Sequence, residues 1–138
     1  MIKGKTMIVR NFNEEFGGKR TIYSNGWNST RLILKNDGMG YSFHITRIDK
    51  GANLEMQYLN HLETVYCITG LGEIEDLGTG KIHKIKPGVM YALNNHDKHI
   101  LRAQTVLELA CVFNPPVIGN EVHNADGAYE LNAEPLDA

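Results

Sequence analysis

The amino-acid sequence predicts an all-β fold, a sandwich or barrel of short strands. Short segments with alternating or β-branched character recur along the chain, and turns rich in Gly, Asn and Asp separate them. The length of 138 residues suits one domain with a single substantial core. We therefore expect residues 1–138 to form one domain with little helix.

The strands can be placed in order along the chain. The expected strands are 31–35, 41–48, 54–59, 64–68, 73–76, 81–85, 90–93, 99–103 and 106–113. The clearest hairpin turn is Leu77-Gly78-Thr79-Gly80, since glycine adopts the positive φ values that tight turns need. A short helix is predicted over 11–16, with Asn13 as its cap. Pro115 and Pro116 cannot donate to a β-ladder, so we expect residues 114–138 to form a tail that wraps the domain.

Charge and composition narrow the possible partners. The net charge is −2 and opposite charges are interspersed, which argues against a nucleic-acid footprint or a basic membrane-binding face. No segment approaches the roughly 18 consecutive apolar residues that span a bilayer. We therefore expect a cytoplasmic protein that acts on a small molecule. Cys67 and Cys111 lack a Cys-x-x-Cys context and are predicted to be buried, reduced thiols.

Period-two alternation gives two of the strands distinct faces. Segment 41–48 carries three polar and three apolar side chains on opposite faces: Ser42, His44 and Thr46 against Tyr41, Phe43 and Ile45. The polar face is either exposed to solvent or turned toward a ligand cavity inside a barrel, and this segment alone does not decide between the two. In the last strand, Cys111 and Phe113 share a face with Leu107 and Leu109, which favours core packing.

The stretch from Gly51 to Gly70 resembles the first metal-binding motif of a cupin barrel. Gly51, Glu63 and Gly70 fall on the motif's spacing, but its two histidine positions hold Gln57 and Leu59. In the second motif, Gly88 is followed by Tyr91 where a histidine would stand, and then by Asn95. The usual histidine-rich site is therefore largely replaced.

Glu63, Tyr91 and His99 remain as possible metal ligands. A carboxylate, a phenolate and an imidazole suit iron or another first-row transition ion better than a structural zinc. Each residue also has an ordinary interpretation: an ion-paired strand residue, a half-buried aromatic and a surface histidine. Two further histidines, His83 and His96, are expected at the surface.

Several longer strings resemble one family, the ectoine synthases. They are Met7-Ile8-Val9-Arg10-Asn11, Asp37-Gly38-Met39-Gly40, Ser42-Phe43-His44, Asn60-His61-Leu62-Glu63, Val65-Tyr66-Cys67, Ile85-Lys86-Pro87-Gly88, Cys111-Val112-Phe113-Asn114-Pro115-Pro116 and Glu121-Val122-His123. The resemblance extends over residues 7–131, so residues 1–6 precede it. Departures at 54–57 and at Leu59 are expected to alter the edges of a pocket rather than its chemistry.

The resemblance implies a fold, a reaction and a set of site residues. The fold would be a cupin-type, jelly-roll-like β-barrel whose opening is covered by the C-terminal tail. The reaction would be the cyclodehydration of N-γ-acetyl-L-2,4-diaminobutyrate to ectoine, with Fe(II) or another first-row divalent ion on Glu63, Tyr91 and His99, in a homodimer. The implied substrate-binding residues are Trp27, Arg31, His44, Thr46 and Phe113, and the implied catalytic residues are Tyr58, Cys111, Glu121 and His123.

Among these residues, Arg31 is expected to hold the substrate carboxylate and Glu121 its amine, with surface ion pairing as the ordinary alternative for both. His123 is expected to carry protons near neutral pH. Two other functions remain open at this point. A cupin that binds a solute without turning it over would keep the barrel and part of the pocket, and a metal-dependent oxygenase would consume oxygen. The missing histidines at positions 57 and 59 argue against the oxygenase.

Overall fold

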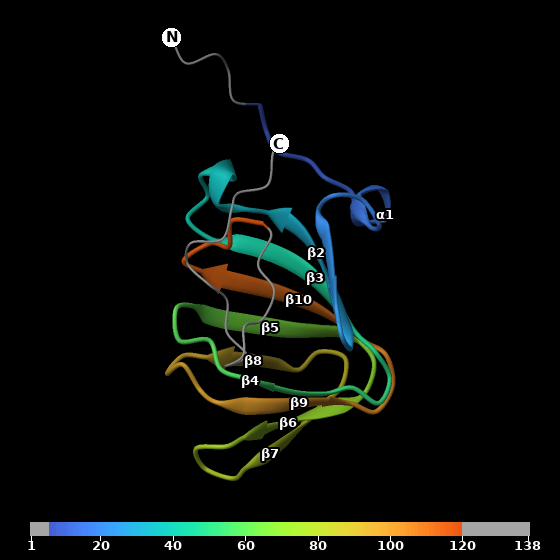
Figure 1. Ribbon diagram of the computed structural model, residues 1–138, viewed down its shortest axis with the longest axis vertical. Coiled ribbons are helices and arrows are strands. Elements are labelled where there is room, and N and C mark those ends of the chain that lie inside the picture. The colour runs from blue at the N-terminus through green and yellow to red at the C-terminus, as the bar shows by residue number, and fades with distance from the viewer. Residues whose placement is uncertain (1–5, 120–138) are drawn as a thin grey trace.

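The computed structural model of the chain describes residues 6–119, which form two antiparallel sheets (Figure 1). In sheet order, the six-stranded sheet contains β1 (Thr21–Ser24), β2 (Trp27–Ile33), β3 (Ser42–Ile48), β10 (Leu107–Asn114), β5 (Leu62–Thr69) and β8 (Met90–Leu93). The four-stranded sheet contains β4 (Asn53–Met56), β9 (His99–Ala103), β6 (Gly72–Asp76) and β7 (Ile82–Ile85). The predicted all-β class is confirmed. Among the described residues, no helix has the length and apolar character needed to cross a membrane.

Most predicted strands are present, and the differences have local causes. β8 and β9 have the predicted bounds. The prediction missed β1, and it began β2 at Arg31 instead of Trp27. The sequence of β1 is too short to show a clear period, and the polar start of β2 is held by its pairing with both β1 and β3. The strand expected over 54–59 ends at Met56, the last residue of β4 to pair with β9.

The two predicted local features are present, with one correction. α1 (Phe12–Glu15) lies within the predicted helix, but its N-cap is Asn11, whose side chain accepts a hydrogen bond from the Asn13 backbone N–H at 2.8 Å. Asn13 was therefore wrong as the cap. The turn between β6 and β7 is confirmed: Gly80 has φ +77° and its N–H donates to the Asp76 carbonyl at 2.7 Å. A 3-10 turn, η1 (Lys35–Asp37), was not predicted.

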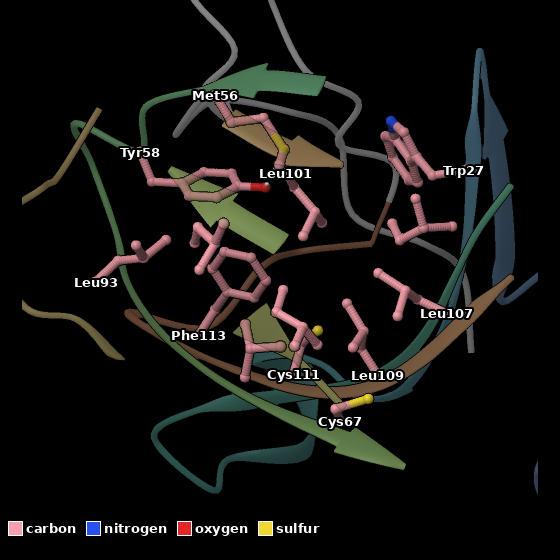
Figure 2. Close-up of a cluster of buried hydrophobic side chains, with 14 of the residues drawn as sticks. Trp27, Met56, Tyr58, Cys67, Leu93, Leu101, Leu107, Leu109, Cys111 and Phe113 are labelled. Atoms are coloured by element: carbon pink, nitrogen blue, oxygen red, sulfur yellow. Dashed lines mark hydrogen bonds between the residues drawn. The ribbon is translucent and has the colours of Figure 1, made fainter. Parts of the chain in front are cut away.

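Side chains from both sheets meet in a common core (Figure 2). In β3, the polar face turns inward: Ser42 and His44 are fully buried, while Phe43 on the other face is half-buried. This settles the open question about segment 41–48 in favour of the inward arrangement. Cys67 and Cys111 are buried free thiols, as predicted. β10 ends at Asn114, just before Pro115, and residues 120–138 of the predicted tail lie outside the described residues.

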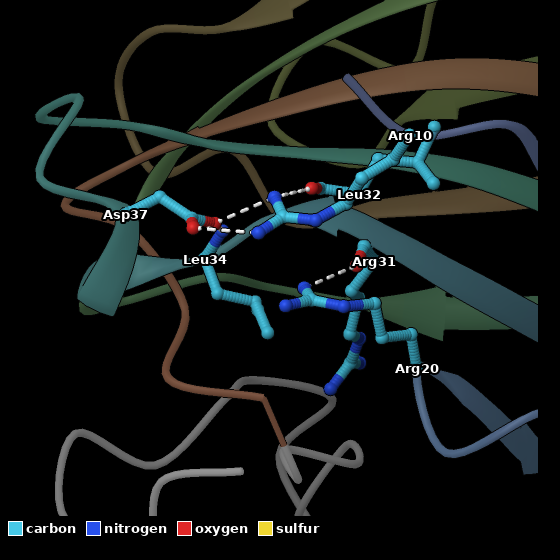
Figure 3. Close-up of polar contacts among 6 residues, drawn as sticks. All are labelled: Arg10, Arg20, Arg31, Leu32, Leu34 and Asp37. Carbon is cyan, nitrogen blue, oxygen red and sulfur yellow. Dashed lines mark hydrogen bonds and ion pairs between the residues drawn. The ribbon is translucent and has the colours of Figure 1, made fainter. Parts of the chain in front are cut away.

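Arg10, from the N-terminal segment, binds the end of β2 through hydrogen bonds (Figure 3). The Arg10 guanidinium donates to the Leu32 carbonyl at 2.6 Å and to both carboxylate oxygens of Asp37, at 2.8 and 3.0 Å. Asp37 also accepts from the Leu34 N–H at 2.9 Å. Partial burial would raise the pKa of Asp37, but these hydrogen bonds together lower it below its usual value. The carboxylate therefore joins the N-terminal segment, β2 and η1.

Replacing Asp37 with Asn is expected to lower the free energy of unfolding at neutral pH by about 1–2 kcal/mol, because a charge-assisted pair becomes a neutral one. Folding lowers the pKa of Asp37, so its contribution is full above the unfolded-state pKa and is lost as the pH falls through the folded-state pKa. Urea unfolding of the two proteins, repeated from neutral to acid pH, should show their free energies converging in acid. Asp49→Asn, at an exposed position, is the control. A difference that stays constant in acid would show that the charge is not responsible.

Candidate active site

A cavity between the two sheets brings together most of the predicted site residues. Its volume is about 30 Å³. The predicted residues that line it are Trp27, Thr46, Tyr58, Glu63, Tyr91, Cys111 and Phe113. Strand register explains this grouping, because Glu63 lies opposite Phe113, and Val65 lies between Cys111 on one side and Tyr91 on the other. Apolar side chains, among them Met56 and Leu109, complete the wall (Figure 2).

The acidic groups of this cavity are held in an apolar environment. Burial raises the pKa of the Glu63 carboxyl to about 8, although a hydrogen bond with the Cys111 thiol acts in the opposite direction. Burial, with a smaller contribution from Glu63, raises the pKa of the Tyr91 phenol well above its usual value. Without a cation beside them, both groups are therefore neutral near pH 7. A bound cation would reverse this by favouring the carboxylate and the phenolate.

His99 has the protonation pattern of a metal ligand. Its ring is almost fully buried, and Nδ1 lies 2.9 Å from the Asp97 carbonyl, which can only accept, so Nδ1 carries the hydrogen. Burial lowers the pKa of His99 and favours the neutral ring, whose lone pair then lies on Nε2. Within residues 6–119, the buried Nε2 has no hydrogen-bond partner. A carbonyl fixing one imidazole nitrogen while the other is available is the usual arrangement around a metal-bound histidine.

The three predicted ligands border two adjoining spaces. Glu63 and Tyr91 line the interior cavity, and Tyr91 and His99 line a neighbouring cleft. In the described part of the chain, no three or more His, Cys, Asp and Glu side chains cluster closely enough to hold an ion. A site built from these residues therefore needs the Tyr91 phenol. The donor set and the available Nε2 of His99 fit a first-row divalent ion.

Arg31 and His44 do not line the cavity but belong to a buried polar network next to it. His44 lies between two hydroxyls, with Nε2 3.1 Å from Ser42 Oγ and Nδ1 3.3 Å from Ser29 Oγ. The Arg31 guanidinium donates to Ser29 Oγ at 3.4 Å and to the Gly119 carbonyl at 2.7 Å. This arrangement differs from the surface ion pair that was the ordinary alternative for Arg31.

One hydrogen bond of this network comes from the backbone after β10. The Val117 N–H donates to Ser42 Oγ at 3.0 Å, and the same hydroxyl pairs with His44 Nε2. Burial, followed by the nearby Arg31 charge and His61, lowers the pKa of His44 well below its usual value, in agreement with a neutral ring. The network thus holds residues 117–119, where the chain leaves β10.

Comparison of this chain with known proteins identifies its family. The sequence matches the family described as ectoine synthase over residues 7–133. It is 58% identical over 132 residues to the L-ectoine synthase of Teredinibacter turnerae, covering 94% of this chain and 100% of that protein. The crystal structure of ectoine synthase from P. lautus matches with a TM-score of 0.78 and 49% identity over 80% of each chain.

The chain belongs to the ectoine synthase family. Ectoine synthases are hydro-lyases, so the protein is a lyase of ectoine biosynthesis. The fold is that of the cupins: an RmlC-like cupin from Shewanella frigidimarina matches with a TM-score of 0.57 at 20% identity, over 68% of this chain and 80% of that one. The family and the cupin-type fold that the sequence strings indicated are both confirmed.

The sequence of this ectoine synthase family member also contains a buried histidine that the prediction missed. His61 is 2% exposed, and its ring lies at a right angle to that of Phe113, with centroids 5.8 Å apart. The available signal was its position two residues before Glu63, on the same inward face. His83 and His96 are exposed, as predicted. The predicted roles of Glu121 and His123 fall outside the described residues.

Replacing Ser42 with Ala is expected to lower the free energy of unfolding by about 1–3 kcal/mol, since the buried Val117 N–H loses its acceptor and His44 Nε2 loses its hydrogen-bond partner. Urea unfolding followed by circular dichroism measures the change. The matched control is Ser24→Ala, at an exposed position at the end of β1, which should stay within about 0.5 kcal/mol of the wild type. Equal stability of Ser42→Ala and the wild type would mean that the network does not hold residues 117–119.

Proposed function

We propose that the protein converts N-γ-acetyl-L-2,4-diaminobutyrate to ectoine and water by intramolecular cyclodehydration. The observation that carries this proposal is the interior cavity, in which Glu63 and Tyr91 face a wall of aromatic and aliphatic side chains. The family match over residues 7–133 supports it. The cavity combines polar groups for a reacting centre with apolar surfaces that favour a folded substrate over an extended, hydrated one.

In this reaction an amine attacks an amide carbonyl of the same molecule, and an amide carbonyl is a weak electrophile. The substrate's α-amine nitrogen forms a bond to the acetamide carbon, and the carbon–oxygen bond of that carbonyl breaks. The oxygen leaves with two protons as water, and a cyclic amidine remains. Holding the amine against the carbonyl removes much of the entropic barrier, and orientation of this kind contributes several kcal/mol in intramolecular reactions, up to about 7–11.

The chain's own side chains supply orientation, exclusion of water and proton transfer. Trp27 and Phe113 wall the cavity and keep bulk water from the product. The Tyr58 hydroxyl lies inside the core, where it donates to the Met56 sulfur at 3.5 Å (Figure 2). We propose that Tyr58 donates a proton to the departing oxygen.

The cavity must widen to accept the substrate. A volume of about 30 Å³ is enough for ordered water but not for a diamino acid derivative. Met56 is unbranched and adaptable, and it lies beside Tyr58 in the wall. We propose that movement of Met56 opens the space between Trp27 and Tyr58. Thr46, which accepts a hydrogen bond from the Cys111 thiol at 3.6 Å, then becomes available to polar atoms of the substrate.

We propose that Glu63, Tyr91 and His99 hold a first-row divalent ion, with Fe(II) as the expected ion. When bound, such an ion supplies Lewis acidity toward a carbonyl oxygen. Around it, Asp97 fixes the His99 ring through Nδ1, and the Cys111 thiol contacts the Glu63 carboxyl. These contacts orient the ligand atoms before any ion arrives.

Product analysis tests the reaction directly. The full chain, loaded with Fe(II), is given N-γ-acetyl-L-2,4-diaminobutyrate beside a chelator-treated sample. Ectoine formed only with Fe(II) supports both the reaction and the role of the ion, and ectoine in both samples supports the reaction without it. Absence of ectoine in both would favour a cupin that binds the solute without turnover.

Single replacements test the ligand assignment. Glu63→Ala and His99→Ala are each expected to lose most of the bound iron and the cyclisation activity together, because three ligands cannot be reduced to two without a large loss of affinity. Metal content per folded protein is measured by elemental analysis, with circular dichroism to verify folding. Asp49→Ala removes an exposed carboxylate that lines neither the cavity nor the cleft and should retain iron. Unchanged iron in both ligand variants would refute the assignment.

We also propose that the cytoplasmic protein is a homodimer that covers the β8 edge. β8 ends the six-stranded sheet, and the exposed side chains of Met90 and Tyr66 lie in register on the outer face there. An uncovered edge with apolar neighbours invites pairing with a second chain.

Met90→Asp is expected to shift the protein from dimer to monomer, since it places a charge in the apolar contact. Sedimentation velocity measures the shift. Ile82→Asp, at a comparably exposed position on the β7 edge, is the control and should remain dimeric. A wild-type monomer, or a dimer that both variants retain, would contradict this assignment.

A further inference from the structure

We infer that the cleft beside His99 is the route by which the divalent ion reaches its ligands, and that Asp76 and Asp97 attract the ion to it. This inference rests on the proposed function, because it assumes that His99 is a ligand. The cleft has a volume of about 170 Å³ and is separate from the cavity where the substrate is expected.

The cleft extends from the surface to a buried ligand. Ala92 and Asn94 line it and are exposed, whereas His99, which also lines it, is 1% exposed. Within the described residues, the His99 Nε2 atom has no hydrogen-bond partner. His99 therefore forms the buried end of a cleft whose other end is open to solvent. Tyr91 lines both the cleft and the interior cavity, so it connects the passage with Glu63.

Charge in the cleft favours a cation. Two of its lining residues, Asp76 and Asp97, are carboxylates, and none of the described lining residues is Lys or Arg. Backbone N–H groups fix both carboxylates: Gly78 donates to Asp76 at 2.8 Å, Thr79 also donates to Asp76, and Asn95 donates to Asp97 at 3.2 Å. A passage lined by one sign of charge raises the local concentration of the opposite ion and its rate of association.

The interior cavity is a poorer route for an ion. It is about 30 Å³ in volume, and its wall is mostly apolar, including Trp27, Leu109 and Phe113. A hydrated divalent ion would have to lose water among these apolar side chains before it reached Glu63 and Tyr91, which is costly. The cleft instead offers carboxylate oxygens before the ion reaches His99.

The test follows Co(II) binding to the chelator-treated full chain by stopped-flow absorbance. The double variant Asp76→Asn with Asp97→Asn keeps an oxygen acceptor at both positions but removes two charges. Its association rate constant is expected to fall about tenfold at low ionic strength, and added salt should shrink this difference. The charge-matched control is the double variant Glu14→Gln with Asp49→Asn, at two exposed positions outside the cleft, which should leave the rate constant unaltered.

A second variant tests the passage without relying on charge. Ala92→Trp places a large side chain at the exposed rim on β8 and should slow both association and release to a chelator by the same factor, so that the dissociation constant stays as in the wild type. Normal rates in both the double variant and Ala92→Trp, with normal Co(II) binding, would overturn the route and leave the ligand assignment intact. Absence of Co(II) binding in the wild type, or binding that His99→Ala does not reduce, would overturn the ligand assignment and the route together.

Discussion

The burial of polar side chains between two largely apolar sheets is the constraint on which the rest of the structure depends. Glu63, Tyr91 and His99 lie on inward faces of β5, β8 and β9, where water cannot solvate them fully. Removing such groups from water costs free energy unless partners compensate, and the cost appears as raised acidic pKa values and a lowered histidine pKa. The ion proposed for this place would offset the cost by stabilising the charged forms.

The central position of β10 joins the site to the buried network that holds the chain after it. β10 pairs with β3 on one side and β5 on the other, so Cys111 and Phe113 touch residues of both strands. The Phe113 ring lies near three others: its centroid is 5.0 Å from that of His44, 5.1 Å from Tyr58 and 5.8 Å from His61. The aromatic wall of the cavity is thus also a wall of the polar network. Disturbance of the network can reach the cavity through Phe113 without any contact with substrate.

The sequence predicted those features that depend on local alternation or on spacing along the chain. Glu63 and Tyr91, which the motif spacing assigned to one site, line one cavity, because that spacing fixes their strands and period two fixes their faces. The strands that depend on neighbours were predicted less well: β1 is too short to show a period, and the polar start of β2 is ordered by pairing on both sides. The link from Arg31 to Gly119 joins residues far apart in the chain, so no local pattern contains it. His61 was missed because it does not fall on a motif position, although it lies two residues before Glu63 and therefore on the same face.

The loss of histidines at positions 57 and 59 is explained by the direction in which this segment faces. β4 ends at Met56, which is buried. Beyond the strand, Tyr58 is also buried, whereas Leu59 is 53% exposed. The Gln57 side chain lies toward the surface, where it donates to the His96 carbonyl at 3.2 Å. A shift of one residue exchanges the inward and outward sets of a strand. Imidazoles at 57 and 59 would therefore point away from the cavity, and the inward positions hold Met56 and Tyr58 instead. The proposed metal ligands accordingly come from β5, β8 and β9, and Met56 and Tyr58 occupy the wall of the cavity in place of imidazoles.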